Sequence, residues 1–172
     1  MPQAMHSYYL REMYLHNNLI KRDHLTIAGE SIDLGRITQP LYAVTAFDDH
    51  IAPWKQCYRI RKYVNVSAPV RFVLSTSGHI LGIVNPPVNP PKRAYWAGEP
   101  EHNEHWKRWQ GRTEKTPGSW WGDWTAWLRQ RDARSGLRDF EAIVALATEH
   151  GMELQLDQAM PANNRTLVFR KR

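Results

Sequence analysis

The sequence has 172 residues, of which 42% are apolar, and its 23 basic and 17 acidic side chains give a net charge of +6. This length and apolar content are enough for an ordinary domain with a core, and the scattered basic residues favour a solvated surface over a nucleic-acid site. The sequence predicts no signal peptide and no membrane helix, and its one cysteine excludes an internal disulfide, which favours a cytoplasmic location.

Two small elements are predicted before residue 40. Leu10, Met13 and Tyr14 recur at helical spacing and predict a helix over residues 5–18. Further on, residues 25–27 and 31–34 flank a glycine and predict a small hairpin.

The next segment organises the rest of the chain as a strand, a helix and a second strand. Residues 41–47 and 70–75 are short, nearly continuous apolar runs, which is typical of parallel strands buried on both faces. Between them, residues 53–64 predict a helix with Pro53 in its first turn. The expected fold class is therefore α/β.

Asp49 and His79 follow the two predicted strands directly. In open α/β sheets, functional residues lie just beyond the carboxyl ends of the strands, so these two side chains are expected to meet. An acid followed by a histidine also fits the last two members of the α/β-hydrolase triad, whose order is nucleophile, acid, histidine. A loop-capping carboxylate and a capped turn histidine are equally good interpretations of these two residues alone.

Four prolines between residues 86 and 91 predict an extended loop, and six tryptophans follow it between residues 106 and 127. These indoles could form a stacking platform for bases or sugars, but the helical spacing of Trp120, Trp124 and Trp127 favours packing. Residues 101–105 contain Glu and His side chains at a spacing that matches no strong zinc signature, so we predict no metal site.

The tail is separated from this part by a polar, charged stretch at residues 131–136. Apolar residues from Phe140 to Ala147 predict a helix, with Asp139 as its N-cap and Gly151 just beyond its end. Residues 152–160 and 166–170 predict an antiparallel strand pair around a turn at residues 161–164.

Five motifs in order along residues 1–130 resemble the poly(hydroxyalkanoate) synthases, in particular those of class I. The motifs are MHSYYLREMYLHNNL from Met5, IDLGRI, FDDHIAPW, VRFVLSTSGHILGIVNPP and PGSWWGDW. The resemblance implies an α/β-hydrolase fold and the polymerisation of (R)-3-hydroxyacyl-coenzyme A into a polyester, with release of coenzyme A. It implies no bound cofactor, because coenzyme A belongs to the substrate.

The resemblance also implies a Cys-Asp-His triad. Asp49 matches its aspartate, His79 its histidine, and His50 the histidine that follows the aspartate. The family nucleophile lies in a Gly-x-Cys-x-Gly elbow, and this sequence contains no such elbow. Its one thiol, Cys57, shares a helix stripe with Ile60, which favours packing over a nucleophilic role.

We therefore interpret residues 1–133 as the C-terminal part of a synthase that is inactive by itself and is completed by a nucleophile-bearing segment or a full-length synthase. The unpaired edge of such a partial sheet favours association with another chain. The alternative is an interaction module without chemistry, which binds polyester granules or a full-length synthase.

Residues 134–172 resemble the C-terminal end of a bacterial family assigned as SAM-dependent methyltransferases. This resemblance is carried by GLRD from Gly136, EAIVALATEHGMEL and MPANNRTLVF. The glycine-rich cofactor loop of those proteins is missing, so no methyl transfer is expected. Two resemblances in one chain suggest a fusion near residue 133.

Overall fold

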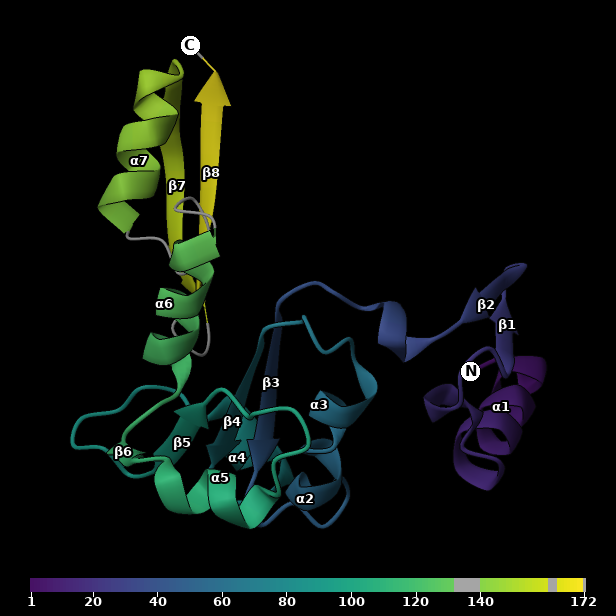
Figure 1. Cartoon of the computed structure of the whole chain (residues 1–172). Coiled ribbons are helices and arrows are strands. Elements are labelled where there is room, and N and C mark those ends of the chain that lie inside the picture. Colours follow the sequence, from purple (N-terminus) through teal and green to yellow (C-terminus); the bar gives the residue numbers. More distant parts are fainter. Residues whose placement is uncertain (132–139, 161–163, 172) are drawn as a thin grey trace. The chain divides into compact units, whose positions relative to one another are not determined.

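The structure is a computed structural model of the whole chain, and it describes all residues except 132–139, 161–163 and 172 (Figure 1). The chain forms two compact units, Met1–Asp123 and Trp124–Arg172. Within the described residues, no helix has the length and apolar character needed to cross a membrane.

The first unit is built on a mixed sheet with the strand order β3-β4-β5-β6. The first two strands are parallel and the other neighbours are antiparallel. The strands are β3 (Leu41–Ala46), β4 (Val70–Ser75), β5 (Ala94–Gly98) and β6 (Lys115–Pro117). The α/β class and the parallel strand pair are confirmed, whereas β5 and β6 were not predicted because they lie among prolines and tryptophans without an apolar alternation.

The connection from β3 to β4 differs from the single helix predicted over residues 53–64. It contains two one-turn helices, α2 (Trp54–Cys57) and α3 (Ile60–Tyr63). Between them, the Arg59 amide donates to the Gln56 carbonyl at 3.1 Å, which is the tighter three-residue spacing of a 3₁₀ turn. This turn interrupts the helix that the apolar periodicity predicted.

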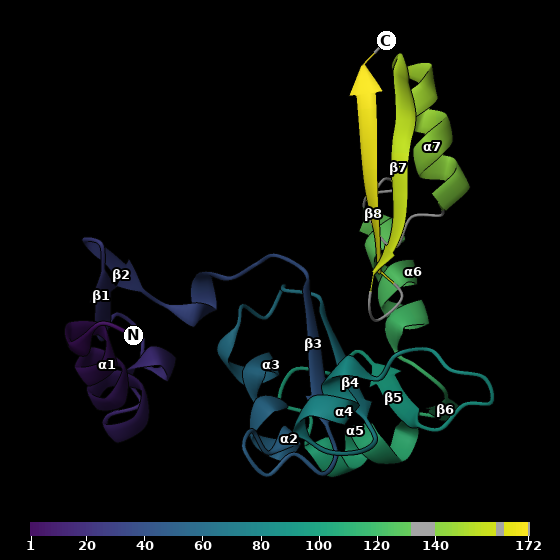
Figure 2. The same ribbon diagram turned by 180° about the vertical axis from the view of Figure 1, so that it is seen from behind.

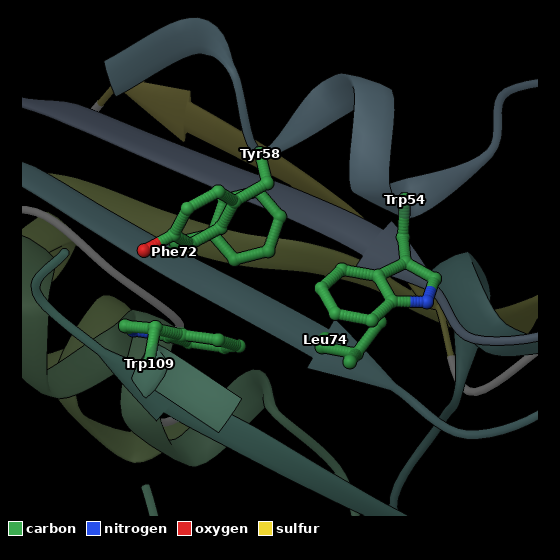
Figure 3. Close-up of a cluster of buried hydrophobic side chains, with 5 residues drawn as sticks. All are labelled: Trp54, Tyr58, Phe72, Leu74 and Trp109. Atoms are coloured by element: carbon green, nitrogen blue, oxygen red, sulfur yellow. The ribbon is translucent and has the colours of Figure 1, made fainter. Parts of the chain in front are cut away.

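Neighbouring residues of β4 point to opposite faces of the sheet. Helices cover both of these faces. On one face, Phe72 and Leu74 contact Trp54 and Tyr58 from the α2–α3 segment and Trp109 from α5 (Trp106–Arg112). Figure 3 shows these rings and Leu74 together as one buried cluster. Trp109 is fully buried and therefore packs in the core, whereas Trp120, Trp124 and Trp127, whose spacing favoured packing, are partly buried.

The opposite face of the sheet is covered by α4 (His79–Val84). Figures 1 and 2, which view the chain from opposite sides, show α5 and α4 on different faces of the strands. The packing is close at Gly82, where an added Cβ atom would lie 2.5 Å from the Ala46 Cβ on β3. The absence of a side chain at Gly82 therefore lets α4 lie directly on the strand.

The segment before the sheet consists of short elements. The predicted helix over residues 5–18 is an α-helix that continues as a π-helical segment, and the predicted hairpin is confirmed. These elements are α1 (Gln3–Tyr9), η1 (Leu10–Leu15), η2 (Asn18–Ile20), β1 (Leu25–Ile27), β2 (Glu30–Ile32) and η3 (Leu34–Arg36). The Asn65 side-chain amide joins η3 to the sheet unit by donating to the Gly35 carbonyl at 2.9 Å.

The tail contains the predicted helix and antiparallel strand pair. They are α7 (Phe140–Glu149), β7 (Met152–Met160) and β8 (Asn164–Lys171), preceded by α6 (Trp121–Arg131). Gly151 has φ +70 just after α7, as expected for the glycine that ends a helix. The predicted cap at Asp139, most of the turn at 161–164 and the predicted boundary at residue 133 lie outside the described residues.

The contact at Gly82 gives a stability prediction. We expect Gly82→Ala to lower the free energy of unfolding by about 1–3 kcal/mol, because the added methyl group overlaps Ala46. The matched control is Gly111→Ala in α5, where a Cβ atom meets nothing within 4 Å and should be neutral or stabilising by up to about 1 kcal/mol. Urea denaturation followed by tryptophan fluorescence measures both variants, and equal effects would contradict the close packing of α4 on β3.

Candidate active site

The candidate site lies where β3 and β4 end side by side. The two strands pair in register from Leu41 opposite Val70 to Ala46 opposite Ser75. Beyond this ladder, the Phe47 amide donates to the Ser75 carbonyl at 2.8 Å, and the Asp48 amide donates to the Ser77 carbonyl at 3.0 Å. These two bonds extend the pairing into the loops, so the residues that follow both strands start from adjacent positions.

The Asp49 carboxylate is held by its own loop. Its side chain is only 3% exposed, and its Oδ1 accepts hydrogen bonds from the amides of Ile51 at 2.9 Å and Ala52 at 2.8 Å. Hydrogen bonds hold the pKa of Asp49 below its usual range, and the bond from the Ala52 amide has a larger effect than the bond to His79. Burial acts in the opposite direction and raises the pKa. Asp49 is therefore an oriented, ionised carboxylate at neutral pH.

His79 is the first residue of α4, and its Nδ1 lies 2.8 Å from Oδ2 of Asp49. An ionised carboxylate can only accept, so Nδ1 carries the proton in this bond and the neutral imidazole is basic at Nε2. The side chain is 43% exposed, and none of the described residues hydrogen-bonds to Nε2. The predicted meeting of Asp49 and His79 is confirmed, and their catalytic role stays a prediction.

The turn before His79 has an unusual backbone. Ser77 has φ +83, a region that residues with a side chain rarely adopt, while Gly78 is extended. Such conformations cost free energy and persist where the surrounding structure holds them. Here the Asp48 amide holds the Ser77 carbonyl, so the loop of β3 fixes the turn that presents His79.

Hydrogen bonds that the sequence did not predict hold the C-terminal end of α4 in place. Asn85 is 2% exposed, and its side-chain amide donates to Ser75 Oγ and to the Gly118 carbonyl, each at 3.2 Å. The indole nitrogens of Trp120 and Trp121 donate to the last carbonyls of α4 at 3.1 and 2.8 Å. The one signal in the sequence was the position of Asn85 directly before two prolines, which is typical of a helix end. The residues to which Asn85 bonds are distant in sequence.

His50 and Cys57 are placed differently from the pair. His50 is exposed, and no hydrogen bond or ion pair joins it to the described residues. Cys57 is partly buried and its Sγ lies 3.6 Å from the Ala52 carbonyl, while burial and then the Asp49 charge raise the pKa of the thiol. A raised pKa keeps the thiol protonated, which favours the predicted packing role over a nucleophilic one.

The acidic and histidine-rich stretch at residues 101–105 is engaged in local structure. Both oxygens of Glu104 accept from Arg112 at 2.7 Å, and His105 caps α5 by accepting from the Lys107 amide. In the part of the chain that the structure describes, no group of three or more His, Cys, Asp or Glu side chains is placed to hold a metal ion.

Most of the chain is similar to known polymerases. It is 40% identical over 134 residues to poly(3-hydroxyalkanoate) polymerase subunit PhaC of Rhizobium meliloti, which covers 78% of this chain and 21% of that protein. The corresponding subunit of Cupriavidus necator is 40% identical, and the match covers 74% of this chain and 21% of that subunit. Poly(3-hydroxyalkanoate) polymerase 1 of Ectopseudomonas oleovorans is 38% identical, and the match covers 76% of this chain and 22% of that polymerase.

The chain contains a polymerase-related region. It spans about a fifth of the length of the curated relatives that it matches. Residues 110–171 also match the model of a family described as protein of unknown function DUF938. That description names no activity, so the methyltransferase resemblance of the tail stays a prediction.

The lowered pKa of Asp49 gives a pH-dependence prediction. An aspartate in an unfolded chain has a pKa of about 3.9, and the folded value is lower, so the ionised carboxylate adds stability above about pH 4. This contribution is lost as the pH falls through the folded pKa. We expect Asp49→Asn to be less stable than the parent at pH 6, with a difference that shrinks below pH 4.

Urea midpoints of the parent and Asp49→Asn between about pH 6 and 2.5 measure this effect. The matched control is Asp48→Asn, because Asp48 is the exposed neighbour and its carboxylate forms no hydrogen bond or ion pair with the described residues. A difference between the parent and Asp49→Asn that stays constant over this range would contradict the assigned ionisation.

Proposed function

We propose that residues 1 to about 130 are the acid- and histidine-bearing part of a poly(3-hydroxyalkanoate) polymerase with an α/β-hydrolase fold. The observation that carries this proposal is the 2.8 Å bond between Asp49 Oδ2 and His79 Nδ1 at the carboxyl ends of two parallel strands. Identity to the PhaC subunits over three quarters of the chain supports the substrate class, a hydroxyacyl-coenzyme A thioester.

In the proposed reaction, His79 works as the general base. Its Nε2 takes the proton of a cysteine thiol, and the thiolate attacks the thioester carbonyl of the hydroxyacyl-coenzyme A. The bond from the acyl carbon to the coenzyme A sulfur breaks, and the leaving thiolate recovers the proton from His79. In the next step, Nε2 takes the proton of the hydroxyl group that attacks the carbonyl of the acyl-enzyme and extends the polyester. The bond from the acyl carbon to the cysteine sulfur breaks, and the cysteine thiolate recovers the proton from His79.

Asp49 stays ionised throughout these steps. Its carboxylate keeps the Nδ1–H tautomer of His79 and stabilises the imidazolium that forms when Nε2 takes a proton. The two backbone amides on Oδ1 leave Oδ2 for the histidine, so the orientation of the pair is set before substrate binds. His50, the next residue, is exposed, and the proposed steps do not use it.

The nucleophile in this proposal comes from outside the chain. Cys57 is the one cysteine of the sequence, and its raised pKa and its place on α2 do not suit attack. The relatives are about five times longer than the matched region, so a further segment or a full-length polymerase is the proposed partner. Within the described sheet, β3 is an end strand, and its outer edge is the proposed site for a strand of that partner.

A second candidate function is an interaction module at polyester granules. It is favoured by large apolar side chains that are exposed along α1 and η1, among them Met5, Tyr14 and Leu15. Such a surface suits contact with an apolar polymer or with a synthase, and it would need neither Asp49 nor His79. Both candidates place the protein at the granule surface in the cytoplasm.

A chimaera tests the enzymatic proposal. In it, the polymerase-like residues of the chain replace the matched 130-residue region of the Cupriavidus necator subunit. We expect the chimaera to release coenzyme A from 3-hydroxybutyryl-coenzyme A, and the isolated chain to release none. His79→Ala should lower the chimaera's rate at least about a hundredfold, because a general base is lost. Cys57→Ala is the matched control and should leave the rate unchanged.

Two results would contradict the enzymatic proposal. One is a chimaera whose release of coenzyme A survives His79→Ala, and the other is turnover by the isolated chain that Cys57→Ala abolishes. A folded chimaera without activity, together with granule co-sedimentation of the isolated chain that survives His79→Ala, would favour the interaction module.

A further inference from the structure

Residues 118–123, between β6 and the first turn of α6, contain three of the groups that bond to the C-terminal end of α4. These groups are the Gly118 carbonyl and the indole N–H donors of Trp120 and Trp121. The chain continues from α4 through one residue into two prolines, which lack the amide hydrogen that could donate to the last carbonyls of the helix. The position of α4 therefore depends on where residues 118–123 lie.

Asp123 fastens this segment to the sheet. Its Oδ1 accepts from the Tyr42 hydroxyl at 2.8 Å and from Arg71 Nε at 3.0 Å, and its Oδ2 accepts from Arg71 Nη2. Two bonds from one guanidinium to one carboxylate are stronger than neutral hydrogen bonds, and they fix the orientation of both groups. Burial, and then the bond to Asp123, raise the pKa of Tyr42, so its hydroxyl keeps the proton that it donates.

The partners of Asp123 belong to the two strands that precede the candidate site. Tyr42 on β3 and Arg71 on β4 lie opposite each other in the parallel ladder. Arg71 shares a face of the sheet with Ser75, four residues further along β4, whose hydroxyl is bonded to the residue that ends α4. Asp123 is therefore anchored on the face of the sheet that α4 covers.

The helix between this anchor and the candidate site is short. α4 has six residues, which correspond to about 9 Å of helix, and its Gly82 lies directly against β3. His79 is the first residue of α4, and the bonds from residues 118–123 reach its other end. Loosening these bonds lets the helix tilt about Gly82, which changes the 2.8 Å distance between His79 Nδ1 and Asp49 Oδ2.

We propose that Asp123 is a positioning residue for His79. Its own bonds go to β3 and β4, and residues 118–123 pass this constraint on to the last carbonyls of α4. The inference rests on the proposed function, because that function makes His79 the general base. The geometry concerned is the bond between His79 and Asp49, which can be measured without any reaction.

Long-range ¹⁵N–¹H NMR of the ¹⁵N-histidine-labelled full chain tests this role, with His79→Gln to assign the His79 signals. We expect the Nδ1–H tautomer in the parent chain and an added Nε2–H population in Asp123→Asn, because the new side-chain NH₂ is a donor that faces an Arg71 donor. Trp121→Phe removes only the N–H on the Val84 carbonyl and should shift the tautomer less, in the same direction.

Glu114→Gln is the matched control for the change from acid to amide. Glu114 is exposed, and its carboxylate forms no hydrogen bond or ion pair with the residues that the structure describes. This variant should leave the tautomer of His79 unchanged. A shift in the control as large as that in Asp123→Asn would overturn the proposal.

The chimaera gives a second readout. Asp123→Asn should lower kcat for coenzyme A release about tenfold to a hundredfold and change KM by less than about twofold, because a displaced catalytic group is costly. In a chimaera that already carries His79→Ala, Asp123→Asn should lower the rate no further, since both changes act through one imidazole. A full additional loss in that background contradicts action through His79.

A folded Asp123→Asn chain that keeps the tautomer of the parent overturns the proposal, and circular dichroism checks the fold. If Asp123→Asn does not fold, Trp121→Phe decides in its place, and an unchanged tautomer in that variant overturns the proposal. An inactive parent chimaera contradicts the proposed function alone, because the tautomer of the isolated chain still measures how His79 is positioned.

Discussion

The parallel pairing of β3 with β4 is the constraint on which the candidate site depends. The strands run in register to their last residues, and two further backbone bonds join the loops that follow. Asp49 and His79 are 30 residues apart in sequence, and this shared edge is what brings their side chains within 2.8 Å. Without the register, the carboxylate and the imidazole would leave the sheet at different heights and could not pair.

The rest of the first unit keeps that pair oriented. Two amides of its own loop hold one oxygen of Asp49, so only the other oxygen is presented to His79. The helix that carries His79 is fixed at its start by the Ser77 turn and at its end by Asn85 and two indoles. It also lies against β3 at Gly82. The proposed role of His79 as a general base requires such a fixed position, because small displacements of a catalytic group are costly.

The sequence predicted those features that depend on local pattern. The apolar runs of β3 and β4 indicated buried strands, and the rule that sites follow the carboxyl ends of strands then placed Asp49 beside His79. The break between α2 and α3, the strands β5 and β6, and the bonds of Asn85 depend on partners that are distant in sequence. The burial of Arg61 likewise cannot be read from the sequence. The chemistry assigned to Asp49 and His79 depends on the family resemblance as well, because an acid and a histidine suit many structures.

The protonation of the His79 ring tests the central claim most directly, since the claim requires a basic Nε2 and a proton on Nδ1 held by Asp49. Long-range ¹⁵N–¹H NMR on the ¹⁵N-histidine-labelled chain reads this tautomer for the neutral imidazole. We expect the Nδ1–H form in the parent chain and its loss in Asp49→Asn. A neutral His79 that carries its proton on Nε2 in the parent, or a tautomer that Asp49→Asn leaves unchanged, would contradict the claim.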